Sequence, residues 1–330
     1  MDDIDRKLLI LIGANPRIHL RELAKRLGIS RQAAHHRMQV LREIGVIKGM
    51  IAGISVDYLD AVPIVVFGRS KGASIEETLN RLGKSEFSRR ANVAGGNYLY
   101  VTGYLRNISE LDSYVEFVRR TAEMSEPTVG ISCLDDGLMP YYPVDGVGKK
   151  RRQNYRELSL LDLKIIDSLK DDARRTVSDI AVMIGASTKT VRRRLKDMIT
   201  EGSLDMSVPS DLQSGGDMFV VVHVNLKDSA DKVEVGKRLL SKYPFQDQYI
   251  RTFSNLPGLL IWVIWSDSIV EIRRVLREVG EAEDVQSVML NFAYLERMYT
   301  TTWWDRLPAV ATGRSKKARA HGRRFEPRNR

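Results

Sequence analysis

Basic and amide side chains gather at helical spacing early in this chain, where they could contact nucleic acid. The N-terminal half of one expected helix carries Arg31, Gln32, His35, His36 and Arg37. Guanidinium, amide and imidazole groups on such a helix can bind base edges and phosphates. A merely solvated helix face would more often include acidic residues, but the first one here is Glu43. The pattern therefore favours DNA recognition, although the apolar periodicity alone would also suit a plain three-helix core.

The flanking residues predict the elements that position this basic face. A helix over residues 4–13 is followed by an amphipathic helix that starts near His19 and ends at Gly28, a residue suited to a tight turn. Ser30 is a suitable N-cap for the basic helix, which stops at Gly45. The next segment, VIKGMIAGIS, has the pattern of a small β-hairpin wing; its Lys48, together with Ser30, is also expected to contact DNA. Together these features predict a winged helix-turn-helix whose second helix enters a DNA major groove.

The module occurs twice. A shift of 157 positions aligns the two copies without a gap, which indicates duplication of a whole unit. The turn glycine, the capping serine and the final glycine all keep their register: Gly28 falls on Gly185, Ser30 on Ser187 and Gly45 on Gly202. The predicted DNA contacts of the second copy are Thr188, Lys189, Thr190, Arg192, Arg193 and Arg194. Its wing, SLDMSVPS, is polar, so the two modules need not hold DNA alike.

Each module is followed by segments in the order βαββαβ. In the first copy they run from PIVVFG to TVGISCL, and in the second from DMFVVVHVNL to VQSVMLNFAYL. The predicted fold class is α+β: two tandem copies of a winged helix-turn-helix followed by a βαββαβ ferredoxin-like sandwich. The strands FVVVHV, LLIWVIW and YLYV are apolar at nearly every residue, so both faces of each sheet should be buried. A second such sheet, in the same chain or another, would cover the open face; the alternative is that Trp262, Trp265 and Tyr100 pack under loops.

These patterns divide the chain into six parts. They are a winged helix-turn-helix domain (1–58), a ferredoxin-like effector and oligomerisation domain (59–145), a basic linker (146–157), a second winged helix-turn-helix domain (158–212), a second ferredoxin-like domain (213–303) and a basic, disordered tail (304–330). The net charge of +10 comes from the linker and tail, because the rest of the chain is close to neutral. The tail would add salt-sensitive affinity for nucleic acid or act only as a solubilising segment.

Other classes of protein find little support. The one cysteine, Cys133, excludes an intrachain disulfide and should be a buried core thiol. The start MDDIDRK does not resemble a signal peptide, and the longest apolar run, LLIWVIW, is far below the roughly 20 residues that span a bilayer. We therefore expect a cytoplasmic protein with no membrane partner, cofactor or metal. His35 and His36 are adjacent and point about 100° apart on a helix, so they cannot share a metal. His223, alone in an apolar strand, should be a satisfied core residue.

The chain resembles the Lrp/AsnC (feast/famine) family of transcriptional regulators in IDRKLLILIGANPRIHLRELAKRLGIS, GVIKGMIAGIS and NVAGGNYLYV. The resemblance implies an amino-acid-like effector between sheets, beside Gly95, Gly96 and Asn97. The second copy reads SNLPGLL there, which departs from the pattern around Asn255 and Gly258. Family members usually have one copy per chain and form dimers, so a tandem chain could imitate a dimer by packing its own two sheets face to face, or could form a homodimer through them.

The sequence predicts a sequence-specific regulator that binds double-stranded DNA and is not an enzyme. Arg37 and Arg194 occupy equivalent places and are expected to orient on phosphate. One alternative is an enzyme that resembles sirohaem decarboxylases, which would need clustered histidine and arginine residues. The other is an architectural protein that binds DNA without regard to sequence. The operator, the effector and the direction of regulation are left open.

Overall fold

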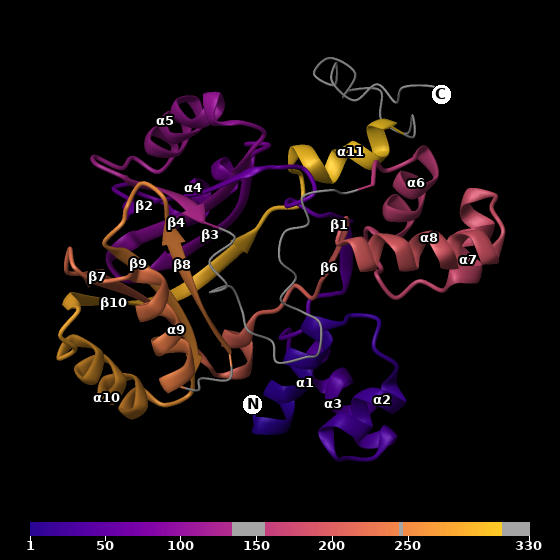
Figure 1. Cartoon of the computed structure of the whole chain (residues 1–330), viewed down its shortest axis with the longest axis horizontal. Coiled ribbons are helices and arrows are strands. Elements are labelled where there is room, and N and C mark those ends of the chain that lie inside the picture. Colours follow the sequence, from indigo (N-terminus) through magenta and orange to yellow (C-terminus); the bar gives the residue numbers. More distant parts are fainter. Residues whose placement is uncertain (134–155, 244–246, 312–330) are drawn as a thin grey trace.

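The computed structural model describes residues 1–133, 156–243 and 247–311. A closed β-barrel lies on one side of the molecule, and two helical domains, here called the heads, lie on the other (Figure 1). The predicted linker lies outside the described residues except for Arg156 and Glu157, as does the predicted tail beyond Ala311.

Each head is a three-helix unit with the predicted helix-turn-helix. The first contains α1 (Asp3–Ala14), α2 (Leu20–Leu27) and α3 (Arg31–Glu43); the second contains α6 (Leu160–Leu169), α7 (Val177–Ile184) and α8 (Thr188–Glu201). The turn glycines, Gly28 and Gly185, have φ values of +68° and +67°, which a residue with a side chain rarely adopts. The Ser30 hydroxyl accepts a hydrogen bond from the Ala33 amide, and Ser187 does the same for Thr190. The sequence prediction of two capped recognition helices is confirmed.

The predicted wing hairpins are wrong, because each copy contributes a single strand. Strand β1 (Ile51–Ile54) pairs antiparallel with β6 (Leu204–Ser207) of the other copy. The heads also exchange hydrogen bonds from equivalent arginines, although the acceptors are not equivalent positions: the Arg17 guanidinium donates to the Ala173 carbonyl, and Arg174 donates to the Ile18 carbonyl. One apolar core runs through both heads. The two heads therefore form a single unit.

The two ferredoxin-like sheets close into one barrel. The first contributes β2 (Val62–Arg69), β3 (Ser88–Ala94), β4 (Tyr98–Leu105) and β5 (Thr128–Cys133); the second contributes β7 (Met218–Leu226), β8 (Asp247–Phe253), β9 (Leu259–Ser266) and β10 (Val285–Met298). The strand order is β10-β3-β4-β2-β5-β8-β9-β7. One seam joins β10 to β3, from Ala293 opposite Ala94 to Met298 opposite Arg90, and the other joins β5 to β8.

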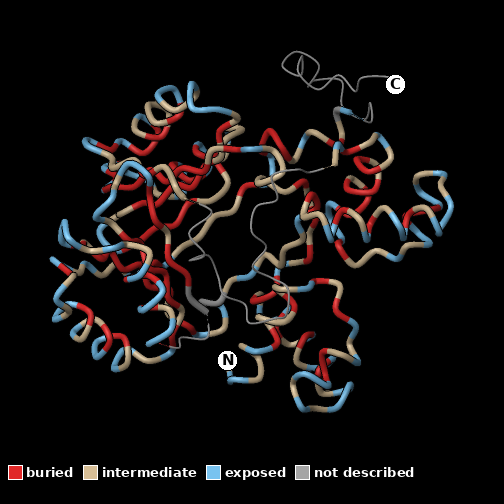
Figure 2. The backbone as a smooth tube through the Cα atoms, in the orientation of Figure 1, coloured by how far each residue is buried: buried red, intermediate tan, exposed pale blue. Residues whose placement is uncertain are grey.

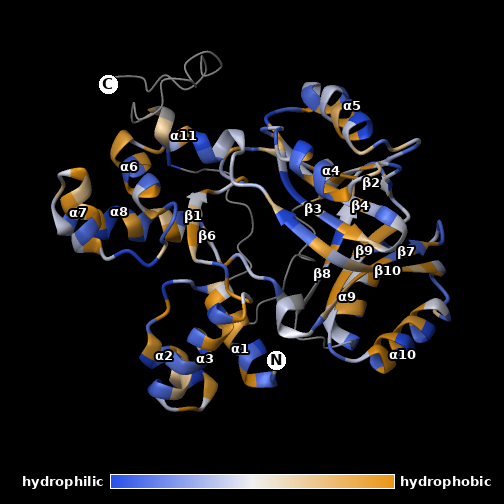
Figure 3. Ribbon diagram, turned by 180° about the vertical axis from the view of Figure 1, so that it is seen from behind, coloured by the Kyte–Doolittle hydropathy of each residue, from blue (hydrophilic) through white to orange (hydrophobic). Residues whose placement is uncertain are grey.

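The strands β2, β4, β7 and β9 are buried on both faces, as predicted, whereas β10 exposes Met289, Phe292 and Tyr294 (Figure 2). The outer faces are covered by α4 (Ile75–Leu82) and α5 (Leu111–Thr121) in the first half, and by α9 (Lys232–Lys242) and α10 (Ile269–Gly280) in the second (Figure 3). The inner faces share a core that includes Phe67, Tyr100 and Val263. Trp262 is fully buried beneath α9 and α10, so the alternative of aromatic residues packed under loops is wrong.

Two sequence expectations need correction at chain segments near the barrel. The segment predicted as a disordered tail from residue 304 begins inside helix α11 (Trp303–Ala311). Trp303 and Trp304 pack on Ala61 and Tyr104, and the helix contacts α6, so the residues of α11 are part of the folded structure. Cys133, at the end of β5, is half-buried and is not a core thiol.

Candidate nucleic-acid interface

Helix α3 presents the polar face that the sequence predicts. The side chains of Arg31, Gln32, His35 and His36 are all exposed, while Ala34, Met38 and Leu41 on the opposite face are buried. Within the part of the chain that the structure describes, Arg31 has no ion pair. The N-terminal half of α3 therefore offers uncompensated hydrogen-bond donors to a ligand in solvent.

Helix α8 presents a more strongly charged face. Thr188, Lys189, Arg192 and Arg193 are exposed, and Lys196 extends the same surface toward the C-terminus. None of these cations has an ion pair among the described residues. Val191, Leu195 and Met198 are buried beneath them, which fixes the helix on its head. The structure thus places most of the predicted DNA-binding residues on two exposed helix faces.

Arg37 and Arg194 differ from this expectation. Arg37 contacts the carboxylates of Asp2 and Asp5 at 2.7 Å, and Arg194 lies 3.5 Å from Asp162, the residue equivalent to Asp5. Burial raises the pKa of Asp162, but hydrogen bonds from Arg156 and Ser159 outweigh it and leave that pKa below its usual range. Each arginine therefore ties its recognition helix to the first helix of its own head, and this pairing competes with the predicted phosphate contact.

Lys48 also lies apart from the recognition helices. Its ammonium group is 3.2 Å from the Asp211 carboxylate, and its backbone amide donates to the Pro209 carbonyl. Lys48 thus belongs to the connection between the first head and the segment that follows β6. Ser30 is on the recognition helix, but its hydroxyl already accepts the capping bond.

The predicted effector residues form the turn between β3 and β4. Gly96 and Asn97 both have positive φ, at +67° and +56°, and the Asn97 carbonyl accepts a hydrogen bond from the Ser70 amide. The Tyr294 hydroxyl is 3.5 Å from the Asn97 side chain. Gly95 and Gly96 are exposed, so the turn lies at the surface. In the second copy, the Asn255 side chain instead bonds the backbone of Val129 and Ile131 across the β5–β8 seam.

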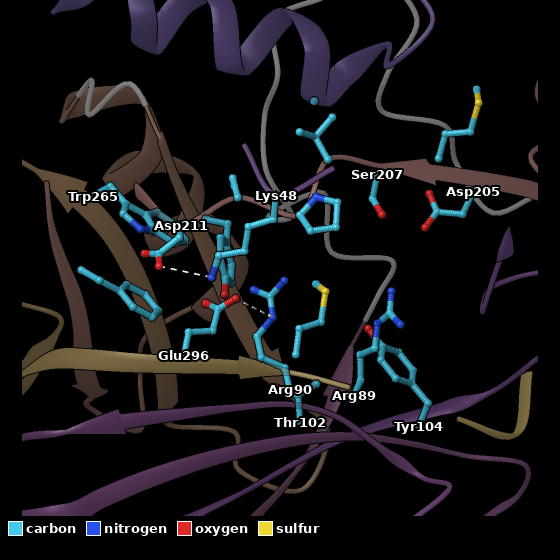
Figure 4. Close-up of a pocket in the computed structure, with 18 of the residues that line it drawn as sticks. Lys48, Arg89, Arg90, Thr102, Tyr104, Asp205, Ser207, Asp211, Trp265 and Glu296 are labelled. Atoms are coloured by element: carbon cyan, nitrogen blue, oxygen red, sulfur yellow. Dashed lines mark ion pairs between the residues drawn. The ribbon is translucent and has the colours of Figure 1, made fainter. Parts of the chain in front are cut away.

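A cavity that the sequence analysis did not predict opens at one end of the barrel. This barrel-mouth cavity has a volume of about 360 Å³ and is bounded by inward-facing barrel residues and by residues 205–211. Figure 4 shows Lys48 and Arg90 pointing toward one another across it. Arg89 and Arg251 also line it. In β3, Arg90 and Asn92 alternate with the buried apolar residues Ala91 and Val93, and this alternation is the sequence feature that could indicate a polar inner face. Only the closed barrel shows that these polar side chains point inward.

Deeper in the barrel, one polar network is enclosed by aromatic rings. His223 is 5% exposed, and its Nε2 lies 2.8 Å from the Tyr100 hydroxyl. The Asn291 amide donates to that hydroxyl at 2.6 Å. Burial lowers the pKa of His223 to about 4 and raises the pKa of Tyr100. The expectation of a satisfied core histidine is confirmed.

Neither a metal-binding cluster nor a membrane-spanning helix occurs among the described residues. No group of histidine, cysteine and acidic side chains within them could hold a metal ion. No helix in the described ranges is both long enough and apolar enough to cross a bilayer.

Comparison with known proteins identifies the heads. Residues 1–48 match the family profile for a winged helix-turn-helix DNA-binding domain, and residues 158–199 match that for an AsnC-type helix-turn-helix domain. The HTH-type transcriptional regulator Ptr1 of Methanocaldococcus jannaschii is 36% identical over 83 residues, which are 25% of this chain and 56% of that protein. The regulator FL11 of Pyrococcus furiosus is 27% identical over 120 residues, covering 36% of this chain and 80% of that protein. These matches show that the chain is similar to transcriptional regulators with AsnC-type helix-turn-helix domains.

One solved structure matches this chain almost from end to end. The sirohaem decarboxylase NirDL covers 94% of this chain and 99% of its own, with a TM-score of 0.58 and 15% sequence identity. At that identity the match shows the fold alone. It supports the tandem α+β architecture, with both heads and both sheets in one chain.

Proposed function

We propose that this protein is a sequence-specific DNA-binding transcriptional regulator that holds DNA with α3 and α8. The exposed, unpaired cations of these two helices carry the proposal, because helix-turn-helix proteins read the major groove with this part of the second helix. The named relatives are transcriptional regulators, which supports the same function.

The arrangement of the heads supports a two-helix mode of binding. The heads share one core, the β1–β6 pair and reciprocal arginine contacts, so they should approach DNA as a unit. Because the paired strands hydrogen-bond each other, they are less free to enter a groove as hairpin wings would. We expect base and phosphate contacts to come mainly from Arg31, Gln32, His35, Lys189 and Arg192.

The test begins with selection of bound fragments from genomic DNA and footprinting of the best site. We expect two protected half-sites about one helical turn or a multiple apart. Arg31→Glu and Arg192→Glu should each weaken binding, whereas Arg273→Glu, an exposed change on α10, should not. If both recognition-helix variants kept the DNA affinity of the unmodified protein, the proposal would be wrong. A salt series on selected and random duplexes separates regulation from sequence-indifferent coating, which would show steep salt dependence and little discrimination.

A second candidate function is decarboxylation of sirohaem, and the end-to-end fold match to NirDL is the observation that favours it. Arginines at the barrel mouth could bind carboxylates of such a substrate. Among the described cavity residues, however, none is a histidine, and His223 is already bonded to Tyr100. The test is anaerobic incubation with sirohaem, followed by visible absorption and mass spectrometry. Loss of carboxyl mass would establish the enzyme, and an unchanged substrate would leave DNA binding as the function.

A further inference from the structure

The two recognition helices expose different chemical groups at equivalent positions. Four amide or imidazole side chains of α3 fall on cations of α8 when the copies are aligned: Gln32 on Lys189, His35 on Arg192, His36 on Arg193 and Gln39 on Lys196. All eight of these side chains are exposed. Arg31, at the start of α3, is the exception, because its counterpart is Thr188. The surfaces that meet a ligand are therefore not copies of each other.

The helices that precede them differ in the opposite sense. Three cations of α2 fall on uncharged residues of α7: Arg21 on Ser178, Lys25 on Val182 and Arg26 on Met183. Arg26 pairs with Glu22 at 2.8 Å, whereas Arg21 and Lys25 are exposed and have no ion pair with another described residue. Val182 is 84% exposed, so α7 presents an apolar side chain to solvent where α2 presents an ammonium group. The first head thus has its extra positive charge on α2, and the second has it on α8.

These groups suit different contacts with a duplex. A glutamine amide bonds N6 and N7 of adenine, whereas arginine and lysine bond O6 and N7 of guanine. Helix α3 is therefore suited to adenine through Gln32 and Gln39, and α8 is suited to guanine through its cations. Because the first helix of a helix-turn-helix crosses the DNA backbone, Arg21 and Lys25 can bind phosphate beside the first half-site. In the second head α7 lacks these cations, so phosphate contacts fall to α8.

The scaffold, by contrast, holds the heads as a twofold dimer would. Residues 47–54 and 204–211 are equivalent in the two copies, and they pair antiparallel, with Ile51 opposite Ser207 and Ile47 opposite Ser210. Antiparallel pairing of equivalent segments is what a twofold interface produces. A twofold protein with identical heads matches a palindromic operator. Here the frame is similar to such a dimer but the two contact surfaces are unlike, so a palindrome would match only one head.

We propose that the protein binds a directional operator, in which an adenine-containing half-site contacts α3 and a guanine-containing half-site contacts α8. The chain then binds each operator in one orientation only. This inference rests on the proposed DNA-binding function and names the class of duplex that the two heads recognise together.

The first test is selection of duplexes by the full chain from a random library. We expect a motif with two unlike halves. Three duplexes of the same half-site spacing are then compared by fluorescence anisotropy: the selected site and the two palindromes built from either half. The selected site should bind about tenfold or more tighter than each palindrome. A palindrome that bound as tightly as the selected site would overturn the inference and leave the proposed function intact. Selection of no sequence over random DNA would reject both.

The second test exchanges the chemistry of one helix. The fourfold variant Gln32→Lys, His35→Arg, His36→Arg and Gln39→Lys gives α3 the exposed groups of α8. It should bind the palindrome of the guanine half-site more tightly than the original operator. Because all four side chains are exposed, the variant should fold, and thermal unfolding checks this. A variant that folded and kept the original preference would overturn the assignment of half-sites to helices.

The third test uses matched positions in the two heads. Arg21→Gln with Lys25→Gln should lower the slope of log affinity against log salt by about 2, because two phosphate contacts are lost. The equivalent changes in α7, Ser178→Gln with Val182→Gln, should leave the slope and the affinity unchanged. Equal effects of the two pairs, or no effect of the first, would overturn the role given to α2.

Discussion

The two heads are copies of one module, but they are specialised in different ways. The first is fixed to the barrel: Arg6 in α1 donates to Asp217 at 2.9 Å and to Asp267 at 2.6 Å, and the N-terminal ammonium donates to the Gly215 carbonyl. The second carries more free charge, since α8 exposes Lys189, Arg192, Arg193 and Lys196. Apart from its contacts with the first head, it meets the rest of the chain at α11.

This difference shows how a tandem chain can diverge where a dimer of identical subunits cannot. The copies retain the residues that fold each head, such as the turn glycines and the pair formed by the first-helix aspartate and the recognition-helix arginine. They differ at the surface. The first copy makes contacts with the barrel, whereas the second exposes more basic residues. The following predictions test this division.

The largest effect is expected at Asp162, whose side chain is fully buried beside Arg156 and Arg194. Asp162→Ala removes both ion pairs and the capping bond to Ser159, so the free energy of unfolding should fall by about 3 kcal/mol. The equivalent change, Asp5→Ala, should cost only about 1 kcal/mol, because the Asp5 side chain is 18% exposed and Asp2 still pairs with Arg37. Urea unfolding measures both. Equal losses in the two variants would contradict the expectation that the more deeply buried Asp162 contributes more to stability. The control is Asp179→Ala, a change at an exposed site.

The next comparison concerns DNA affinity. Arg192→Gln with Arg193→Gln should weaken binding to the selected duplex about 100-fold, and Arg31→Gln about tenfold, if α8 contributes more charge than α3. The slope of log affinity against log salt should fall by about 2 and about 1, respectively. Fluorescence anisotropy over a salt series gives both values, with Arg273→Gln as control. A greater loss from α3 would reverse the division of roles.

The two halves of the chain also contribute different side chains to the barrel interior. Phe67 in β2 and His223 in β7 face each other with ring centroids 5.4 Å apart, so an apolar ring opposes a titratable one. Because the folded pKa of His223, about 4, is below the ordinary 6.5, the unfolded chain takes up the proton first as pH falls. This contribution to stability is present above pH 6.5 and is lost as pH falls toward 4.

Between pH 7 and pH 5 we expect the free energy of unfolding to drop by about 2 kcal/mol because of His223 alone. His223→Phe, which copies the residue opposite, should remove that part of the pH dependence. Urea unfolding at several pH values measures the slope. The same slope in the variant would show that another group causes it.

The smallest effect is expected where the copies remain equivalent. Arg17→Gln and Arg174→Gln each remove a hydrogen bond between the heads and should cost about 1 kcal/mol apiece. The double variant, measured by the same unfolding assay, should lose roughly the sum, because each arginine bonds a different carbonyl. Clearly unequal single losses would show that the interface between heads is not symmetric.

Much of this architecture could be predicted from local sequence patterns. Gly28 and Ser30 mark the helix-turn-helix because their conformational preferences are local, and the alignment with Gly185 and Ser187 revealed the duplication. Several strands are apolar at nearly every residue, which predicts that both of their faces are buried. The exposed face of each recognition helix followed from the same periodicity.

The rest depends on contacts between residues that are distant in the chain. Strand register across the β10–β3 seam and the β1–β6 pair carries no local signal, so the sequence predicts hairpin wings instead of paired single strands. The cavity was missed for the same reason, because Arg90 and Arg251 converge only when the barrel closes. The sequence predicts a phosphate contact for Arg37, because its pairing with Asp2 and Asp5 joins two helices that are separated in sequence.

Closure of the barrel also limits how copies of this protein can associate. Strand β10 uses one part of its length on β7 and another on β3, and β5 joins β8, so neither sheet retains a free edge in the strand order. Open edges are where other chains can add strands and where sheets begin to aggregate. Among the described residues, the barrel therefore offers no free strand edge to another chain, and open edges are confined to the short β1–β6 pair.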